Sequence, residues 1–321
     1  MHFHHSRKLH DTVGEEYQQL WEQGQRNVAE KLTLVVTCTD RKSVQPAPSL
    51  RVGNLPSGPQ HERAIHWRGA LRAERARRPL RQLYQGDAWT QALKLEESAR
   101  RSGFDPTLLV ASAGLGLVSA DEAWPAYAAT FSPRQVDSIG TSGSDSKAWW
   151  RLMTAGRKHF SEQVAGQTLF VLSQTYSTAM ADDLKPLANR EDVVVFGGST
   201  EVPGHLRIPA DGGLRAALGG TSGSLNLRTA IAWIESLKAP TLVGHRHHQE
   251  WRDWVEKTRQ PKNYDRIPMS DADVLTFVRD LRRVQPDISK TRALRVLRDG
   301  GLACEQKRFG ALFECATKEK I

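Results

Sequence analysis

The chain has 321 residues, of which 39% are hydrophobic and 25% are charged, as in an ordinary globular protein with a sizeable core. It carries 45 Lys and Arg against 36 Asp and Glu, and this formal charge of +9 favours an acidic partner only where the charge is clustered. Three cysteines exclude a disulfide framework, and no apolar run reaches the ~18 residues of a membrane span, so the sequence predicts a cytoplasmic protein with no membrane partner.

Alternating strand and helix patterns predict an α/β fold for residues 1–258. Short β-branched runs predict strands at 32–38, 107–113, 168–174, 193–198 and, more weakly, 241–244. Helical periodicity predicts helices at 11–30, 88–102, 146–163, 177–187 and 225–236. This alternation is typical of an open, mostly parallel sheet flanked by helices, in which ligands bind beyond the carboxyl ends of the strands.

An arginine-rich segment at about 44–82 interrupts the alternation. It holds eight arginines against two glutamates, with no clear strand. Because guanidinium groups pair well with phosphate, we expect an inserted basic arm that follows a nucleic-acid backbone. A solvated basic face is the alternative that the sequence leaves open. The arginines assigned to nucleic acid are Arg72, Arg75, Arg77, Arg78 and Arg81.

Residues 269–321 have the pattern of a small helix-turn-helix module. Ser270 can cap a helix that runs to Arg283, and a second helix at 290–298 stops before two glycines. An apolar, hairpin-like end completes the layout of a winged helix. The basic side chains of the second helix that we assign to nucleic acid are Lys290, Arg292 and Arg295.

Cys38, Asp40 and Lys42 follow the first predicted strand, at the edge where a parallel sheet binds its ligands. A thiol near a cation can act as a nucleophile, and a carboxylate can act as a general acid or base. The sequence therefore suggests a catalytic site here. A small buried cysteine beside a solvated charged turn is the structural alternative.

Two glycine-rich turns supply candidate substrate-binding residues. Small residues at 112–116 let a ligand approach backbone N–H groups, and the loop at 211–228 opens into a helix that could receive phosphate. The second loop lacks the Lys-Ser/Thr ending of an ATP-binding loop. Tight turns and a surface loop remain the alternatives. The candidate substrate-binding residues are Ser112, Gly114, Gly116, Glu122, Tyr127, Asn226 and Arg228.

Four short motifs follow one another in an order that resembles the YaaA/DUF6884-like superfamily. They are Cys-Thr-Asp-Arg-Lys at 38–42, Leu-Tyr-Gln-Gly at 83–86, Ala-Ser-Ala-Gly-Leu-Gly-Leu-Val at 111–118 and Pro-Ala-Tyr at 125–127. The sequence departs from the family's pattern at Gly114, Leu115 and Ala128, so the roles of those side chains are not carried over.

The resemblance implies a role in nucleic-acid damage or modification. A core of this kind with a basic arm and a DNA-binding tail is similar to proteins of the bacterial 7-deazaguanine DNA modification systems. That likeness implies hydration of the 7-cyano group of a deazaguanine base to the 7-carboxamide. Cys38 would be the nucleophile, Asp40 the proton shuttle and Lys42 the stabilising cation, with a water-only route through Asp40 or Glu122 left open.

The implied partner is DNA, either double-stranded with the base flipped out or single-stranded, together with other DNA-modification proteins. No cofactor and no metal is expected, and the histidines at 245, 247 and 248 are interpreted as turn residues in preference to metal ligands. One competing function is that of a non-catalytic YaaA-like protein that binds modified or damaged DNA. Another is that of a transcription regulator, with the tail as its DNA reader and the core as a ligand sensor.

Overall fold

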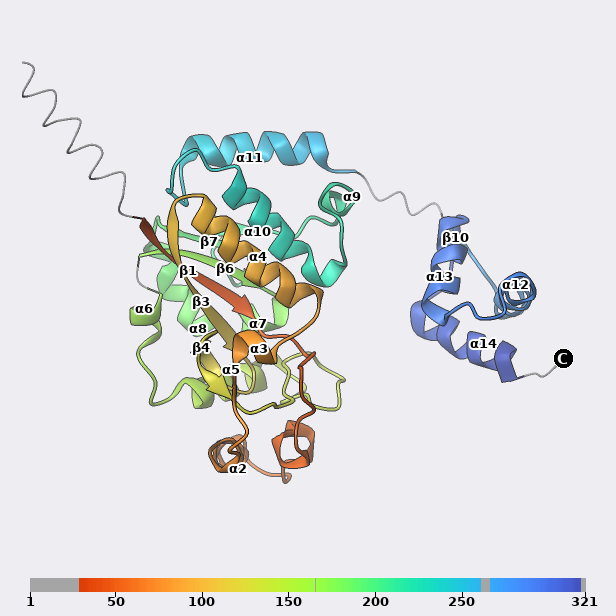
Figure 1. Ribbon diagram of the computed structural model, residues 1–321, viewed down its shortest axis with the longest axis horizontal. Helices are drawn as coiled ribbons and strands as arrows, with labels where there is room; N and C mark the ends of the chain where they lie inside the picture. Colours follow the sequence, from red (N-terminus) through yellow and green to blue (C-terminus); the bar gives the residue numbers. More distant parts are fainter. Residues whose placement is uncertain (1–28, 165, 261–265, 319–321) are drawn as a thin grey trace, which may run out of the picture. The chain divides into compact units, whose positions relative to one another are not determined.

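The computed structural model describes residues 29–164, 166–260 and 266–318, and the helix predicted at 11–30 falls outside these ranges but for its last two residues. The chain divides into two compact units, residues 1–260 and 261–321 (Figure 1). Each unit has a hydrophobic core of its own.

Six strands form the main sheet of the first unit, in the order β4-β3-β1-β6-β7-β8 (Figure 1). They are β1 (Glu30–Thr37), β3 (Phe104–Ser112), β4 (Gly116–Ser119), β6 (Gln167–Leu172), β7 (Val193–Gly197) and β8 (Arg207–Ile208). All neighbouring pairs are parallel except β3 and β4, which form a hairpin. The predicted α/β class and mostly parallel sheet are confirmed.

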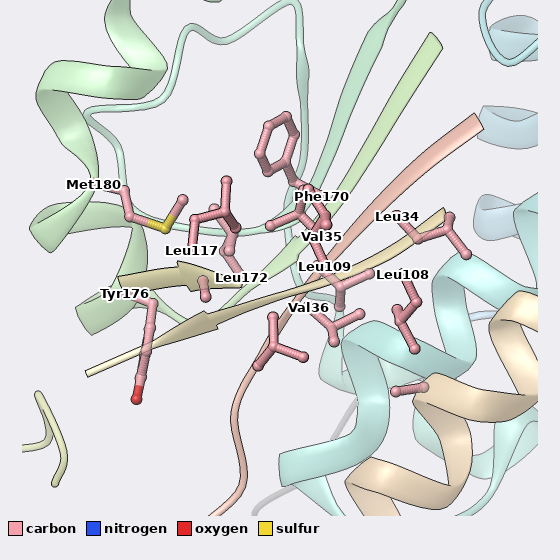
Figure 2. Close-up of a cluster of buried hydrophobic side chains, with 14 of the residues drawn as sticks. Leu34, Val35, Val36, Leu108, Leu109, Leu117, Phe170, Leu172, Tyr176 and Met180 are labelled. Carbon is pink, nitrogen blue, oxygen red and sulfur yellow. The ribbon is translucent and has the colours of Figure 1, made fainter. Parts of the chain in front are cut away.

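The central strand β1 is buried on both faces, which explains its uninterrupted apolar run. Its register places Val35 between Leu109 of β3 and Phe170 of β6, and Figure 2 shows these side chains in one cluster. Burying each such side chain contributes about 1.5–3 kcal/mol. The ends of β1, β3 and β6 are therefore held firmly beside one another.

Helices cover both faces of the sheet. Figure 2 shows α4 (Asp87–Arg101) and α10 (Leu225–Glu235) on one side of the central strands, with the helices that follow β6 on the other. The remaining helices of this unit are α2 (Gln60–Ala73), α3 (Leu80–Leu83), α5 (Gly143–Thr154), α6 (Phe160–Gln163), α7 (Gln174–Ala179), α8 (Ala181–Leu184), α9 (Arg215–Leu218) and α11 (His245–Thr258). In the described ranges, no helix is long and apolar enough to cross a membrane.

Some predicted elements differ from the structure. The helix expected at 146–163 is two helices, because Gly156 adopts a positive φ of 78° between α5 and α6, and the one expected at 177–187 is broken into α7, α8 and a 3-10 turn. The strand expected at 241–244 does not form. There the backbone N–H of Leu242 donates to the side chain of Gln167, and the sheet is completed by β4 and β8, neither of which was predicted.

The arginine-rich segment is folded into the first unit and is not an extended arm. Besides α2 and α3 it contains the 3-10 turns Pro48–Leu50 and Val52–Asn54 and the short strand β2 (Arg78–Pro79), which pairs with β5 (Ala123–Trp124). Trp67 and Leu80 are completely buried, and the Trp67 indole N–H donates to the carbonyl oxygen of Gly114 over 2.7 Å. The segment is thus a wall of the core that carries arginines on its outside.

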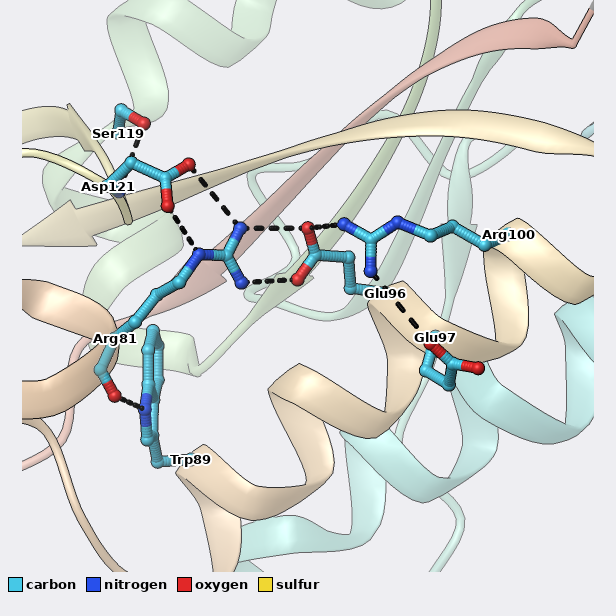
Figure 3. A network of polar contacts seen from close by, with 7 residues as sticks. All are labelled: Arg81, Trp89, Glu96, Glu97, Arg100, Ser119 and Asp121. Carbon is cyan, nitrogen blue, oxygen red and sulfur yellow. Dashed lines mark hydrogen bonds and ion pairs between the residues drawn. The ribbon is translucent and has the colours of Figure 1, made fainter.

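Arg81, which the sequence pattern assigns to nucleic acid, instead belongs to an internal ion network (Figure 3). Its guanidinium donates to both carboxylate oxygens of Glu96, at 2.5 and 2.8 Å, and to Asp121 at 2.5 Å. Arg100 contacts the same Glu96, whose side chain is only 2% exposed. Hydrogen bonding to Glu96 raises the pKa of Arg81 above its ordinary value. This arginine neutralises a buried carboxylate.

The second unit is a helical domain with a small core of its own. It contains α12 (Asp271–Val284), α13 (Lys290–Asp299), α14 (Gln306–Lys318) and the parallel pair β9 (Ile267–Pro268) and β10 (Leu302–Ala303). Ser270 caps α12 through a capping box with Asp273, and Ser289 caps α13, as expected for these residues. The apolar end predicted as hairpin-like is the helix α14, because Phe309, Leu312 and Ala316 recur at helical spacing.

Replacing Arg81 with Ala should lower the free energy of unfolding by about 3 kcal/mol, because it leaves the buried Glu96 carboxylate with Arg100 as its remaining arginine partner. Urea denaturation measures this change. Arg78→Ala is the matched control, since Arg78 is exposed and its loss should change stability by no more than about 0.5 kcal/mol. Equal effects of the two substitutions would contradict the structural role of Arg81.

Candidate functional site

The strand order defines where a ligand site should lie in the first unit. From β1 the chain proceeds to β3 on one side, whereas from β6 it proceeds to β7 on the other. Connections that diverge in this way leave a crevice beyond the carboxyl ends of the two strands. Cys38 directly follows β1, and Tyr176 lies four residues beyond the end of β6, in α7. These two side chains therefore mark the switch point of the sheet.

The Cys38 thiol and the Tyr176 hydroxyl are hydrogen-bonded across this switch point, with 3.0 Å between Sγ and Oη. Cys38 is half-buried, and Tyr176 is buried with its ring edge-on to Phe131. Figure 2 shows the Tyr176 hydroxyl pointing away from the apolar cluster. Burial, followed by the negative charge of Cys38, raises the pKa of Tyr176 well above its ordinary value. Tyr176 therefore keeps its proton and can donate a hydrogen bond to a thiolate at Cys38.

Three further hydroxyl groups form a buried chain beside this pair. The Tyr127 hydroxyl lies 2.5 Å from that of Tyr84 and 2.5 Å from Ser112 Oγ. Ser112 Oγ already accepts hydrogen bonds from the N–H groups of Gly114 and Leu115, both at 3.1 Å, so it must donate to Tyr127. The hydroxyls of Tyr84 and Tyr127 carry two protons, and the hydrogen bond between them uses one. The other proton is left for a further acceptor.

Lys42 supplies a positive charge at the same place. Its ammonium donates to the carbonyl oxygens of Thr39 at 3.0 Å and Asp40 at 3.2 Å. It also lies over the ring of Tyr127, 4.6 Å from the centroid, and 5.5 Å from that of Tyr84. Burial lowers the pKa of Lys42, while the negative charges of Cys38, Asp40 and Asp137 oppose this shift. Lys42 thus gives up a proton more readily than an ordinary lysine.

These side chains form one connected group, which we call the thiol cluster. Burial, and after it the charge of Cys38, raises the pKa of both Tyr84 and Tyr127, so the thiol interacts electrostatically with both rings. The cluster combines a nucleophile, a cation and neutral hydroxyl donors, which is a set suited to covalent catalysis. The members of the thiol cluster are Cys38, Lys42, Tyr84, Ser112, Tyr127 and Tyr176.

Among the described residues, no group of three or more His, Cys, Asp or Glu side chains is arranged to hold a metal ion. His247 and His248 lie in the first turn of α11 and pack edge-on against Trp233, at centroid distances of 4.3 and 4.9 Å. Burial lowers the pKa of both imidazoles. These two histidines therefore belong to an aromatic contact between α11 and α10.

The structure does not bring all predicted site residues together. Asp40 is exposed and contributes its backbone carbonyl to Lys42. Glu122 accepts hydrogen bonds from the backbone N–H of Ser119 and from the indole N–H of Trp124, at 3.0 and 3.1 Å, so it holds the turn after β4. It does not contact the thiol.

The two residues predicted from the loop at 211–228 are engaged elsewhere. Arg228 pairs with Asp87 at the start of α4 over 2.9 Å, and Asn226 donates to the carbonyl oxygen of Leu172 over 3.4 Å. The loop is held against α4 because Ser224 also donates to Asp87. Arg228 and Ser224 are thus engaged within the fold, while residues 221–223 of the loop remain exposed.

Gly114 and Gly116 shape the turn between β3 and β4. Of the backbone N–H groups that a ligand was expected to approach in this turn, those of Gly114 and Leu115 are bonded to Ser112. A Cβ at Gly114 would lie 2.6 Å from the Tyr127 ring, and Gly116 has a positive φ of 77°. Glycine at these two positions thus allows Tyr127 to reach Ser112.

Two members of the thiol cluster are not among the predicted site residues. Tyr84 lies in the Leu-Tyr-Gln-Gly motif, which could have identified it. Tyr176 lies in a helical segment with no motif of its own, and its partner Cys38 is 138 residues away in the sequence. Only the strand order reveals that the two belong together.

The remaining basic side chains divide into anchored and exposed groups. Arg77 donates to the carbonyl oxygens of Leu71 and Glu74 and lies over the ring of Trp124. In the second unit, Lys290 pairs with Glu314 over 2.8 Å. Of the residues predicted to bind nucleic acid, all of which lie in the described ranges, those exposed with neither an ion pair nor a side-chain hydrogen bond are Arg72, Arg75, Arg78, Arg292 and Arg295. These five are the ones free to meet a polyanion.

Comparison of the chain with protein-family models, curated proteins and solved structures found no match. The chemical role of the site is therefore inferred from the geometry of its side chains.

The lowered pKa of Lys42 predicts a pH-dependent stability. Between its folded pKa and the ordinary value of 10.5, the unfolded chain binds a proton that the folded chain does not, so the free energy of unfolding rises with pH in that window. Lys42→Met should remove this rise, as measured by urea denaturation in steps from about pH 7 to about pH 10.

The buried tyrosines lower the free energy of unfolding as the pH rises above about 10, because only the unfolded chain ionises them there. They are present in both proteins, so the difference between wild type and Lys42→Met isolates the lysine. If the difference in free energy of unfolding between wild type and Lys42→Met stayed constant across this pH range, Lys42 would have an ordinary pKa.

Proposed function

We propose that the chain is a DpdC-like member of the YaaA/DUF6884-like superfamily, an enzyme that hydrates the 7-cyano group of a 7-deazaguanine base in DNA to the 7-carboxamide. The observation that carries the proposal is the 3.0 Å contact between the Cys38 thiol and the Tyr176 hydroxyl, at the switch point of the sheet and beside the Lys42 ammonium. A nitrile carbon is electrophilic, and a thiolate is the side-chain nucleophile best suited to attack it.

In the first step the Cys38 thiolate adds to the nitrile carbon, and the nitrile nitrogen takes a proton from the Lys42 ammonium. The product is a thioimidate joined to Cys38, with Lys42 as a neutral amine. The lowered pKa of Lys42 supports this step, because an acid tuned toward the working pH transfers its proton more easily. Tyr176 holds the sulfur in place before the attack.

In the second step water adds to the thioimidate carbon, its hydroxyl going to carbon and its proton to nitrogen through Lys42. The carbon–sulfur bond then breaks, the thiolate leaves, and the hydroxyl proton passes to Lys42 as the carboxamide forms. Thiolate and ammonium are restored, and the net change is addition of one water. Asp40 is exposed beside Lys42 and can exchange protons between this lysine and solvent.

The exposed arginines of both units are proposed to hold the DNA. Arg72, Arg75 and Arg78 lie on the outer side of the arginine-rich segment, and Arg292 and Arg295 lie on α13. In a helix-turn-helix module the second helix is the one that enters the major groove. A base within a duplex would have to be flipped out to reach the thiol, at a cost of a few kcal/mol that these contacts would offset.

Cys38→Ala should abolish nitrile hydration, because no other group in the thiol cluster can form the thioimidate. Mass spectrometry of cyano-deazaguanine DNA incubated with the pure protein measures the gain of one water. Cys315→Ala is the matched control, since this cysteine is exposed on the second unit and should be dispensable. Tyr176→Phe should reduce the rate by roughly 10²-fold while leaving the ring in place.

Two results would count against this mechanism. Full activity of Cys38→Ala would exclude the thioimidate and favour the water-only route. DNA that is bound tightly by the wild-type protein and recovered unchanged would favour the alternative function, a protein that binds modified or damaged DNA without altering it. The exposed arginines are the observation that keeps this alternative open.

Binding to DNA should depend on salt through the exposed arginines. Replacing Arg72, Arg75 and Arg78 together with Ala should reduce the slope of log affinity against log salt by about 0.9 for each phosphate that the variant no longer neutralises. Fluorescence anisotropy with a labelled duplex at several salt concentrations measures the slope. Arg246→Ala is the control, because Arg246 lies on α11 in an ion pair with Glu250. An unaltered slope in the triple variant would remove this surface from the DNA interface.

A further inference from the structure

A second concave site lies between the arginine-rich segment and the turn after β5. It is a pocket of about 270 Å³, near the lower end of the volumes usual for small-ligand sites. Its apolar lining includes the exposed Val44 and the half-buried Ala47, and its polar lining includes Gln45, Glu74, Arg77 and Arg78. None of the residues that line it belongs to the thiol cluster.

The pocket and the thiol cluster share two stretches of backbone. Leu83 lines the pocket, and its neighbour Tyr84 belongs to the cluster. Likewise, Ala126 lines the pocket, and its neighbour Tyr127 belongs to the cluster. The pocket therefore adjoins the cluster along the backbone, while its lining consists of other side chains.

The wall of the pocket favours an anion. Arg77 is fixed by its bonds to Leu71 and Glu74 and by the Trp124 ring, whose centroid is 5.7 Å from the guanidinium carbon. Its remaining N–H groups and the exposed guanidinium of Arg78 can donate to a ligand. Two guanidinium groups on adjacent residues suit a phosphate group.

The acidic side of the pocket can recognise hydrogen-bond donors. Glu74 Oε1 accepts from the backbone N–H of Ala76 over 2.9 Å, which fixes the carboxylate and leaves Oε2 for a ligand. Gln45 is exposed on the wall and adds an amide that both donates and accepts. A guanine edge carries neighbouring N–H donors that match a carboxylate, whereas adenine lacks that pair. The exposed side chain of Val44, together with Ala47, can cover the face of such a ring.

We propose that this pocket binds a guanine nucleotide, with the phosphate on Arg77 and Arg78, the base against Val44 and Ala47, and its N–H edge on Glu74. Binding at this site does not require nitrile hydration at Cys38, although the two sites share backbone at Leu83–Tyr84 and Ala126–Tyr127. A guanine or deazaguanine nucleotide of a bound strand, or a free one, presents the same chemistry to it.

Isothermal titration calorimetry of the full chain with dGMP, dAMP and inorganic phosphate tests the proposal. We expect dGMP to bind at least tenfold more tightly than the other two. Glu74→Gln should reduce the preference for dGMP over dAMP about tenfold, because the carboxylate that pairs with the guanine edge is lost. Arg78→Ala should weaken both nucleotides by a similar factor, because it removes a phosphate contact.

The matched control is Glu62→Gln, an exposed glutamate of α2 outside the pocket, which should bind dGMP as wild type does. Ala47→Trp fills the pocket and should abolish binding while circular dichroism reports an intact fold. Equal affinity for phosphate and dGMP, an unchanged preference in Glu74→Gln, or full binding by Ala47→Trp would overturn the proposal. None of these outcomes depends on activity at Cys38.

Discussion

The hydrogen bond between Cys38 and Tyr176 joins the ends of the two strands at which the connections of the sheet diverge. A buried polar group without a partner costs about 1–3 kcal/mol, so the groups around this bond must satisfy one another. They do so through the Tyr84, Tyr127 and Ser112 hydroxyls and through the carbonyl oxygens that hold Lys42. In the described residues the only buried side-chain atoms without a partner are on Gln60 and His247, outside the cluster.

The arginine-rich segment has two roles that its composition does not separate. Its inner side packs Trp67 and Leu80 into the core, and Arg81 neutralises Glu96 there. Its outer side carries Arg72, Arg75 and Arg78, whose charges face solvent. A buried ion pair holds the segment in register, because removing either partner would leave a charge in a medium of low polarity. The segment can therefore present charge to a polyanion from a rigid wall, without the ordering cost of a flexible arm.

The proposed chemistry and the proposed nucleotide pocket depend on the same backbone. Tyr84 and Tyr127 face the thiol, while their neighbours Leu83 and Ala126 line the pocket. A ligand in the pocket would press on the segments that carry two of the cluster's hydroxyls. The glycines at 114 and 116 leave room for the cluster because they have no side chain. A Cβ at Gly114 would collide with the Tyr127 ring. Close packing transmits such displacements because the interior has few voids.

Local sequence was enough to predict the class of fold, the strands β1, β3, β6 and β7, the capped helices α12 and α13, and Cys38 with Lys42 as a candidate pair. Each of these follows from residues close together in the chain, where periodicity, caps and adjacency act. Three-dimensional packing was needed to show that Tyr176 meets Cys38, that Arg81 and Arg228 pair with Glu96 and Asp87, and that the last apolar stretch is a helix. Those outcomes depend on partners far away in the sequence, and a local pattern carries no information about which distant group will neutralise a charge or share a proton.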